Sequence, residues 1–562
     1  MLLAFGWIIG FFIHSIFLFI ITIIVPLNIF TSLLIICGES YLIYCIVQKR
    51  LRLPKAFQFN FKLPQHEQNP YYFIMLIFIT LIMTRHYLAS FINYPNTIPA
   101  LPSNLIDEEI SVINSILHGC NHIRFSIFLK DPQLINSKYS GPSLPVLFTS
   151  FLMSIDVDYD LATCVLSYFN ILATSILLYN FMSFSTHSPV LGCMIFFFNS
   201  GISIIRPILF KYPPNADYVT NVGREIPLPW YQTLFYFMTY SKDAMFSIPV
   251  ALLVLDIVTN RRKEHPYRYY LAGLMSALVP NPAVSLTLFI INSAFPDSFK
   301  KVMPFAGLLV IKLIGVPIRS FPIWREQQMQ GHFCSQITSL FENYGILSFV
   351  FIFSILHYSS MPLLHRDFTF IAAWIYTFFF RVGNDVTNNV LAQQACILPL
   401  LCAICSDWFY IVNTNYLFSV LRKSLFRICI FSLILGGIIV GIRISSCHID
   451  AYDLYSLDAA KWVRTQLSAH QLVLTEPTMF NPVSLAGRQI LCGDYTSVWK
   501  RGGDITNVVP TLREAESGGW ITLARKLKVQ WIVLPNITKY STEGLEVYSQ
   551  NSHWRLLMNR NI

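Results

Sequence analysis

Long apolar runs recur along the 562-residue chain, and they constrain its fold more than any other feature. The hydrocarbon core of a bilayer needs about 20 apolar residues for each helical pass. Runs that approach or reach this length cover residues 2–24, 27–47, 71–93, 161–182, 190–210, 244–258, 303–318, 344–357, 367–382, 391–412 and 425–443. The stretch 267–295 contains Pro280-Asn281-Pro282 and is expected to make two short passes, which predicts about thirteen transmembrane helices in total.

Composition excludes two other classes of protein. Only 12% of the residues are charged, whereas soluble globular chains carry about 25%, so the chain is not one large soluble enzyme. Its 46 Phe, 28 Tyr and 10 Trp exclude intrinsic disorder. The formal net charge of +10 is divided among short clusters between apolar runs, which is typical of cytoplasmic anchoring and argues against nucleic acid as a partner.

The basic clusters predict the orientation of the chain, because Lys and Arg are concentrated in cytoplasmic loops. These clusters are Lys49-Arg50 with Arg52 and Lys55, Arg261-Arg262-Lys263, Lys300-Lys301, and Arg422-Lys423. Placing them in the cytosol puts residues 94–160, 211–243, 319–343, 383–390 and everything after 444 on the opposite side. The glycosylation sequon Asn536-Ile537-Thr538 agrees with a luminal tail in the endoplasmic reticulum membrane. The first run lacks the features of a cleaved signal peptide and is expected to be a retained helix.

The composition changes near residue 445, where shorter segments of alternating type begin. Helices are expected over 456–468 and 519–527, and strands over 471–475, 489–492 and 531–534. The chain is therefore predicted to have two leading helices and a basic loop over 1–70, a transmembrane module over 71–444, and a soluble α/β domain over 445–562. The fold class is an α-helical polytopic membrane protein with a small α/β extracytosolic domain.

The first outer loop carries the strongest candidates for chemistry. Asp107-Glu108-Glu109 stand where a helical pattern begins. One of these carboxylates could act as a general base, or Asp107 and Glu109 could hold Mg²⁺ or Mn²⁺ against a phosphate. The alternative is that they only complement the dipole of a helix N-terminus. Asp131 is a second loop carboxylate, although Asp131-Pro132 could simply form a turn.

Several other polar groups lie at positions where charge is costly. Arg206 and Arg381 fall in or beside apolar runs, where charges normally pair or line a cavity. Either guanidinium could bind a lipid-linked phosphate, and Arg381 could instead pair with Asp385 on one helix face. Lys242, at the start of another run, could also bind a lipid-linked phosphate. Alternatively, its side chain could simply extend to the membrane–water interface. Asp156-Val157-Asp158 has the spacing of a metal-binding motif but is expected to be a turn.

The tail contains a distinctive segment, Asn481-Pro482-Val483-Ser484-Leu485-Ala486-Gly487-Arg488, with Gly493 shortly after it, and we expect it to be a loop between strands. This segment is similar to the NHPV-x-x-LAGR pattern of one branch of the GT-C superfamily of membrane glycosyltransferases. Arg381 to Asn389 resembles an outer loop of the same branch, and the resemblance spans about residues 71 to 535. Asn481 is followed directly by Pro482, so the His of the pattern has no counterpart and its role does not transfer.

The resemblance implies a reaction and a set of residues. GT-C enzymes take sugars from polyprenyl-phosphate or dolichyl-phosphate donors, and many need no metal. Their first outer loop carries the catalytic acid residue, which by position is Asp107, with Glu108 and Glu109 as competitors and Asp131 as the second carboxylate. Arg381, Arg206 or Lys242 would face the donor phosphate. Asp385, Asn481 and Arg488 would support the acceptor or the loop, and the acceptor could be a protein, a glycan or a lipid.

The rival class is a transporter or channel, or a non-catalytic scaffold subunit of a membrane complex. A transporter is expected to place ionisable residues near the middle of the membrane and often has duplicated halves. This chain instead concentrates carboxylates within 107–160 and has a substantial outer domain without an internal repeat. These features favour the enzyme.

Overall fold

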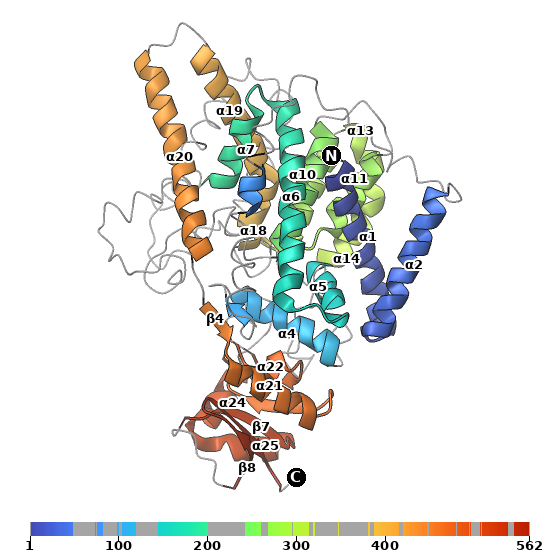
Figure 1. Cartoon of the computed structure of the whole chain (residues 1–562), viewed down its shortest axis with the longest axis vertical. Coiled ribbons are helices and arrows are strands. Elements are labelled where there is room, and N and C mark those ends of the chain that lie inside the picture. The colour runs from blue at the N-terminus through green and yellow to red at the C-terminus, as the bar shows by residue number, and fades with distance from the viewer. Residues whose placement is uncertain are drawn as a thin grey trace. The chain divides into compact units, whose positions relative to one another are not determined.

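The computed structural model of the chain is mostly helical, with a small mixed sheet near the C-terminus (Figure 1). It describes residues 2–48, 74, 76–81, 98–100, 104–119, 144–199, 242–259, 268–294, 296–313, 318–320, 347, 380–382, 387–414, 420–446, 449–478, 480–493, 495, 506, 508–537 and 544–560. Most of the predicted runs 71–93, 344–357 and 367–382 lies outside these residues. The predicted number of helical passes therefore stays a prediction.

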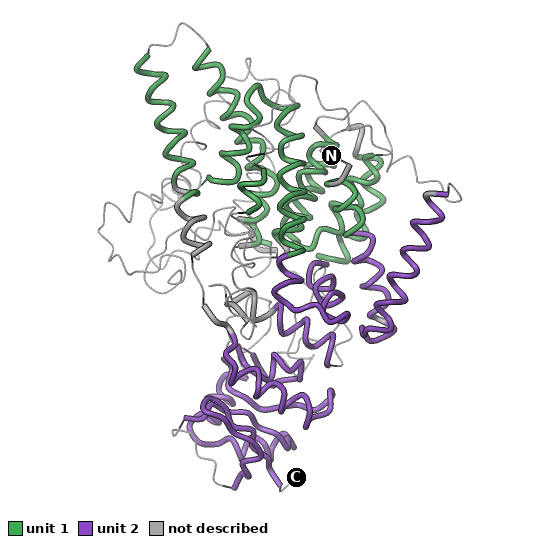
Figure 2. Tube along the Cα trace, viewed as in Figure 1, with its two compact units in different colours: residues 1–11, 51–86, 165–447 green, residues 12–50, 87–164, 448–562 purple. Residues whose placement is uncertain are grey.

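The chain divides into two compact units (Figure 2). Unit 1 comprises residues 1–11, 51–86 and 165–447, and unit 2 comprises residues 12–50, 87–164 and 448–562. Each unit is thus assembled from segments that are far apart in the sequence.

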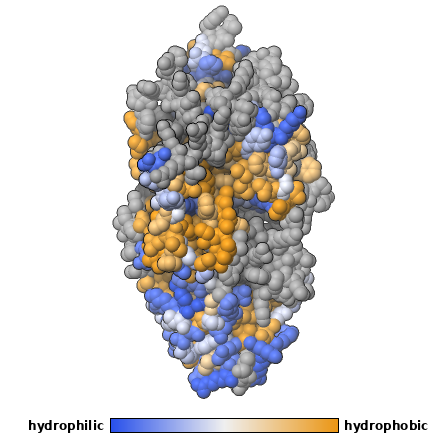
Figure 3. Space-filling model, turned by 90° about the vertical axis from the view of Figure 1, so that its right-hand side faces the viewer, coloured by the Kyte–Doolittle hydropathy of each residue, from blue (hydrophilic) through white to orange (hydrophobic). Residues whose placement is uncertain are grey.

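Within the described residues, four helices are long and apolar enough to cross a membrane: Ala4–Thr22, Ile29–Ile46, Tyr159–Ser185 and Gln393–Thr414. The first two belong to α1 (Leu2–Ile24) and α2 (Ile29–Val47), which lie within the predicted runs 2–24 and 27–47. Large apolar side chains of α2 are exposed, among them Ile29, Phe30 and Leu34. In the view of Figure 3, exposed apolar side chains form a patch, as expected for a surface in contact with lipid.

Unit 1 contains most of the remaining helices. They are the greater part of α6 (Tyr159–Ser185), then α7 (Pro189–Phe198), α10 (Lys242–Thr259), α11 (Arg268–Leu278), α12 (Pro282–Ala294), α13 (Pro296–Val302), η4 (Met303–Phe305), α14 (Ala306–Leu313), α18 (Thr387–Ala392), η8 (Gln393–Ile397), α19 (Leu398–Thr414) and α20 (Val420–Ser446). Strands β2 (Ile318–Ser320) and β3 (Phe380–Val382) pair antiparallel in the same unit.

The predicted break in the stretch 267–295 is confirmed. Helix α11 ends at Leu278 and α12 begins at Pro282. Asn281 precedes α12, and its side-chain Oδ1 accepts hydrogen bonds from the amides of Ala283 (3.0 Å) and Val284 (3.1 Å). Because a first-turn Pro lacks only an amide that would be unpaired anyway, Pro282 starts the helix without loss.

Unit 2 combines α4 (Asn104–His118) and α5 (Leu144–Ser154) with the C-terminal part of the chain. Strand β1 (Ile98–Ala100) pairs antiparallel with β4 (Ile449–Tyr452). The tail then contributes α21 (Leu454–Gln466), β5 (Leu472–Thr475), α22 (Pro482–Leu485), β6 (Gln489–Ile490), α24 (Val508–Glu514), η9 (Ala515–Gly519), α25 (Trp520–Leu527), β7 (Trp531–Pro535), β8 (Glu546–Gln550) and β9 (Trp554–Met558).

The tail forms one five-stranded mixed sheet in the order β6-β5-β7-β9-β8. Strand β5 is parallel to both β6 and β7, whereas β9 is antiparallel to β7 and β8. The predicted tail helices and strands are confirmed to within about two residues at each end. Strands β8 and β9 were not expected, because the burial of β8 follows no clean alternation that would separate it from a loop.

The close approach of α7 and α20 gives a test of the fold of unit 1. A methyl group at Gly437 would overlap the backbone carbonyl of Phe198. We expect Gly437→Ala to destabilise unit 1 by roughly 2 kcal/mol, because backbone atoms cannot move aside as a side chain can. Gly307→Ala is the matched control, since nothing lies within 4 Å of its added methyl group. The measurement is urea-dependent labelling of Cys193, which is buried in α7. Equal labelling curves for the two variants would contradict the close packing.

Candidate functional site

Helix α4 carries the acidic cluster of the first outer loop. Its backbone begins at Asn104, so positions 107, 108 and 109 lie within its first two turns. The predicted helical pattern is confirmed, because Ile110, Ile113 and Ile116 are all buried. Glu109 is half-buried, and the side chains of Asp107 and Glu108 lie outside the described part of the chain. The helix thus holds the three positions at the end where a negative charge is favourable.

Two glycines allow α4 to pack directly against the tail segment. Gly487 has a φ of +73°, and a methyl group there would overlap the carbonyl of Asn114 on α4. A methyl group at Gly119, just after the helix, would lie 2.5 Å from the carbonyl oxygen of Gly487. Backbone therefore meets backbone at this contact, and both positions require glycine.

Arg488 completes the contact by binding the ends of two helices. Its Nη1 donates to the carbonyl of His118, the last residue of α4. Its Nη2 donates to the carbonyls of Arg464 (3.1 Å) and Leu467 (3.0 Å), and its Nε also donates to Leu467 (3.2 Å), at the end of α21. The last carbonyls of a helix have no partner within the helix. One buried guanidinium therefore caps the C-termini of two helices.

Asn481 has a similar internal role at the other end of the segment. It caps α22, because its Oδ1 accepts a hydrogen bond from the amide of Val483 (2.9 Å). Its Nδ2 donates to Thr475 Oγ1 (2.6 Å) and to the carbonyl of Glu476 (3.2 Å). The segment expected to be a plain loop thus contains one turn of helix that Asn481 holds at the end of β5.

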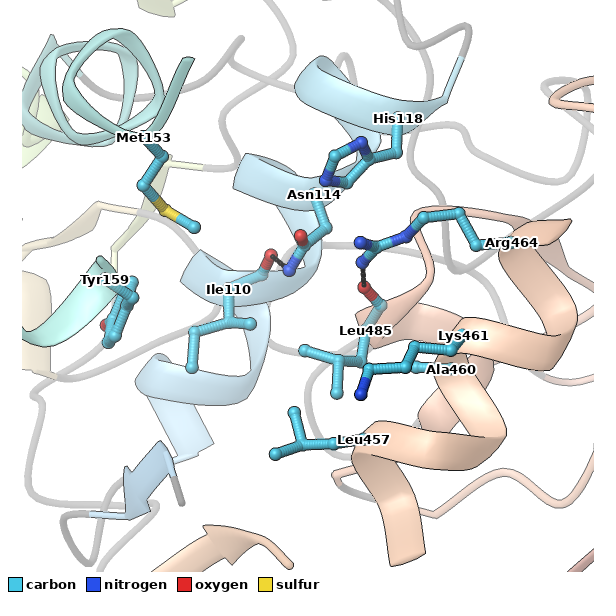
Figure 4. A pocket seen from close by; sticks show the side chains of 10 residues that line it. All are labelled: Ile110, Asn114, His118, Met153, Tyr159, Leu457, Ala460, Lys461, Arg464 and Leu485. Carbon is cyan, nitrogen blue, oxygen red and sulfur yellow. Dashed lines mark hydrogen bonds between the residues drawn. The ribbon is translucent and has the colours of Figure 1, made fainter. Parts of the chain in front are cut away.

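A cavity of about 200 Å³ lies in unit 2 beside α4 (Figure 4). Its lining comes from α4, α5, the start of α6, α21 and α22, and consists of Ile110, Asn114, His118, Met153, Tyr159, Leu457, Ala460, Lys461, Arg464 and Leu485. Apolar side chains form much of the wall, and three basic side chains, those of His118, Lys461 and Arg464, face it together with the amide of Asn114. The described part of the lining contains no carboxylate.

Arg464 is the central charge of the cavity. Its guanidinium points toward Asn114 and His118 of α4 in Figure 4 and donates from Nη2 to the carbonyl of Leu485 (3.1 Å). Its Nε is buried and finds no hydrogen-bond partner among the described residues. Desolvation and the neighbouring charge of Arg488 lower the pKa of Arg464 from its usual high value. The group stays charged at neutral pH, because an arginine is not deprotonated in a protein.

The other two nitrogen groups differ in charge. Lys461 is exposed and lies 3.7 Å from Asp458 on its own helix. Desolvation, together with the positive charges of Arg464 and Arg488, lowers the pKa of His118 to about 4. At neutral pH the cavity therefore offers two cations and one uncharged imidazole.

Helical periodicity relates the acidic cluster to the cavity. Positions 107, 110, 114 and 118 of α4 follow spacings of three and four residues, so they share one face of the helix. Ile110, Asn114 and His118 line the cavity. Position 107 is therefore on the same stripe of α4 as these lining residues, one turn before Ile110. Glu109 interacts electrostatically with Tyr159, another residue of the lining.

The patterns in the sequence did not single out the three basic groups of the cavity. His118 could have been found from its spacing to Asp107, since both fall on the same helical stripe. Lys461 and Arg464 are three residues apart within a predicted helix, which places them on one face. No local signal in the sequence indicates that this face meets α4.

The structure describes the remaining predicted site residues only in part. Asp131, Arg206 and Asp385 lie outside the described residues. Arg381 is in β3 and Lys242 is the first residue of α10, but their side chains are not among those described. Strand β3 itself is held by a side chain of α18: Asn389 donates from Nδ2 to the carbonyl of Phe380 (2.6 Å) and accepts from the amide of Val382 (3.1 Å).

Two groups of carboxylates in the sequence have a pattern that could hold a metal ion. Asp156-Val157-Asp158 is a turn between α5 and α6, as expected, and Asp156 has a φ of 70°. The described residues contain no group of three or more His, Cys, Asp or Glu side chains that could hold a metal ion. The possible Mg²⁺ or Mn²⁺ site at Asp107 and Glu109 stays a prediction, because the Asp107 side chain is not described.

The contact between α4 and the tail can be tested at Gly487. We expect Gly487→Ala to destabilise unit 2 by about 3 kcal/mol, because it adds backbone strain and a clash with α4. The matched control is Gly518→Ala, which has the same kind of positive φ (+123°) but nothing within 4 Å of the added methyl group. Urea-dependent labelling of the buried Cys492 thiol measures the effect. If Gly518→Ala lowered the stability of unit 2 as much as Gly487→Ala does, backbone strain alone would explain the effect and the clash with α4 would not.

The lowered pKa of His118 predicts a pH dependence. The unfolded chain binds a proton at His118 near pH 6.5, whereas the folded unit binds it only near pH 4. The stabilisation is therefore complete above pH 6.5 and decreases as the pH falls toward 4. We expect His118→Gln to flatten this part of the pH profile of Cys492 labelling, and His470→Gln, a substitution of an exposed tail histidine, is the comparison variant. An unaltered profile in His118→Gln would contradict the electrostatic account.

Comparison with known proteins gives a likeness in structure. No family model and no curated protein matches the chain. It is similar to the archaeal oligosaccharyltransferase AglB from Archaeoglobus fulgidus in complex with an inhibitory peptide and a dolichol-phosphate, with a TM-score of 0.45, 12% identity, and coverage of 83% of this chain and 69% of that chain. The apo form of the Archaeoglobus fulgidus oligosaccharyltransferase gives a TM-score of 0.41, 13% identity, and coverage of 83% and 70%.

Both likenesses are weak in TM-score and identity. Only the residues of this chain therefore carry the functional conclusion.

Proposed function

We propose that the protein is a membrane glycosyltransferase that moves a sugar, mannose or another hexose, from a polyprenyl-phosphate or dolichyl-phosphate donor to an acceptor. The observation that supports this most is the position of Asp107 on α4. The position lies on the stripe that faces a cationic cavity, and Arg488 fixes the helix at its far end. A carboxylate, a rigid support and a recess for substrate are thus combined in one unit.

The proposed reaction inverts the configuration of the sugar. The Asp107 carboxylate accepts the proton of the acceptor hydroxyl or amide while that atom attacks C1 of the sugar. The lipid phosphate leaves from the opposite face with the electrons of the C1–O bond. A cation must stabilise this leaving phosphate, and Arg381, Arg206 and Lys242 are the candidates. Glu108 and Asp131 are the alternative bases.

Support of α4 is central to this proposal. A general base works only when it is held within hydrogen-bonding distance of the proton that it removes, and a displacement of about 1 Å can cost a hundredfold in rate. The internal contacts of Arg488 and Asn481 favour the supporting role for both residues over direct contact with an acceptor. Asp385 would support the acceptor or the loop.

The setting of the reaction follows from the orientation predicted by the basic loops. The site would face the lumen of the endoplasmic reticulum, and the donor lipid would reach it from the bilayer. The acceptor is a protein, a glycan or a lipid. Asp107 and Glu109 could also hold Mg²⁺ or Mn²⁺ if the enzyme uses a metal.

Substitution of the loop carboxylates tests the proposal. We expect Asp107→Asn to lower transfer by at least about a hundredfold, which is the usual contribution of a general base, without changing expression. The measurement follows radiolabelled mannose and glucose as they leave their dolichyl-phosphate donors in a reconstituted membrane. Glu108→Gln and Asp131→Asn are the matched comparisons, and we expect them to retain most of the activity.

Other outcomes of this experiment are informative. If Asp107→Asn is active and one of the other two variants is not, the base is at that other position. Full activity in all three variants would remove the loop carboxylates from the mechanism.

A further inference from the structure

We propose that the cavity beside α4 is a binding site for a phosphate monoester group. The group would be bound by Arg464 and Lys461, with His118 as an uncharged hydrogen-bonding partner. This goes beyond sugar transfer, because it gives the unit a second anion site away from the donor phosphate.

The charge balance of the cavity is the first argument. Arg464 is half-buried and lies close enough to Arg488 for the two charges to repel each other. None of the described residues that line the cavity is a carboxylate, and Asp458, outside this lining, pairs with the exposed Lys461. Two neighbouring guanidiniums, one of them only partly exposed, are costly together, and a bound anion reduces that cost.

The hydrogen-bonding capacity is the second argument. Among the described residues, Arg464 donates one hydrogen bond, to Leu485, and its buried Nε has no partner. A guanidinium has five N–H donors in a planar fork that matches the oxygens of a phosphate. Arg488, in contrast, already donates to the carbonyls of two helix ends. Arg464 therefore has donors available, and Arg488 contributes only its charge.

Charge and size favour a phosphate monoester over a carboxylate. Such a group carries about −1.5 to −2 charges at neutral pH, which matches the two cations Lys461 and Arg464. The cavity volume of about 200 Å³ is below the roughly 300 to 1,000 Å³ of pockets that enclose a whole small molecule. It can hold one group and the atoms next to it, with Ile110, Leu457 and Leu485 against the apolar part.

The proposed phosphate site lies away from the proposed catalytic base at position 107, an inference that rests on the proposed function. Position 107 and His118 are about 16 Å apart along the helix axis, at 1.5 Å per residue. The reacting atoms must lie about 3 Å from the base. A phosphate at the Arg464 end of the cavity thus belongs to a remote part of the acceptor, where it contributes to binding and orientation.

Binding is tested on the full-length protein in nanodiscs, without a sugar donor. Hydrogen exchange of the α4, α21 and α22 segments is followed while inorganic phosphate, glucose 6-phosphate or acetate is added at constant ionic strength. We expect saturable protection by both phosphates and none by acetate. In a further arm, phosphatidic acid is placed in the nanodisc. Selective protection by glucose 6-phosphate assigns the group to a sugar, selective protection by phosphatidic acid assigns it to a lipid, and either result supports the site.

The variants are chosen to separate binding from folding. Arg464→Gln is expected to weaken phosphate binding by about tenfold or more, the value of a charge-assisted hydrogen bond. Lys461→Gln changes an exposed residue that cannot disturb the packing and is expected to weaken binding by several-fold. Arg525→Gln, on an exposed residue of α25, is the matched loss of charge and should bind as the wild type does.

Three results would overturn the site: protection by acetate equal to that by phosphate, no saturable protection of the wild type, or wild-type binding in both Arg464→Gln and Lys461→Gln. The failure of the proposed function is distinguishable from these. Asp107→Asn should still bind phosphate if the cavity is as described, whether or not it transfers sugar. An Asp107→Asn variant that loses transfer but still binds phosphate supports the catalytic role of Asp107 and leaves the phosphate site intact.

Discussion

The guanidinium of Arg488 is the constraint on which unit 2 depends. Two helices, α4 and α21, end with carbonyl groups that cannot be paired within their own helices, and both ends are satisfied by this one side chain. A buried charge is tolerated only where its donors are satisfied. Arg488 meets that condition through backbone carbonyls, which a side-chain substitution does not remove. Gly487 and Gly119 allow the approach that brings those carbonyls within reach.

Two neighbouring arginines of unit 2 have different roles. Arg488 uses its donors to cap helices, whereas the nearby Arg464 has a buried Nε without a hydrogen-bond partner among the described residues. Desolvation lowers the pKa of His118 most, and the charges of Arg464 and Arg488 add to this effect. The structural charge of Arg488 thus contributes to the electrostatics of the cavity without lining it. The acidic end of α4 lies at the opposite end of the helix, so the helix would separate the two proposed sites along its axis.

Local patterns in the sequence predicted much of the secondary structure. The apolar periodicity of Ile110, Ile113 and Ile116 identified α4, and the turn residues near 280 identified a break between two short helices, because both signals act within a few residues. The cavity could not be predicted, since it depends on which face of α21 meets α4. That contact is set by two glycines and one arginine whose partners are far away in the sequence. The tail segment 481–488 is distinctive in the sequence, but its role is seen only in three dimensions, where its Arg488 caps two helices.

The hydrogen bond between Arg488 and His118 joins residues that are 370 positions apart. A ribosome adds about 5 to 20 residues per second, so α4 waits roughly 20 to 70 s for the partner that caps it. During that interval its apolar face, with Ile110 and Ile113, has no tail to cover it. The unit therefore cannot mature in the order in which it is synthesised, and α4 is the segment in which a chaperone or premature aggregation would compete with folding.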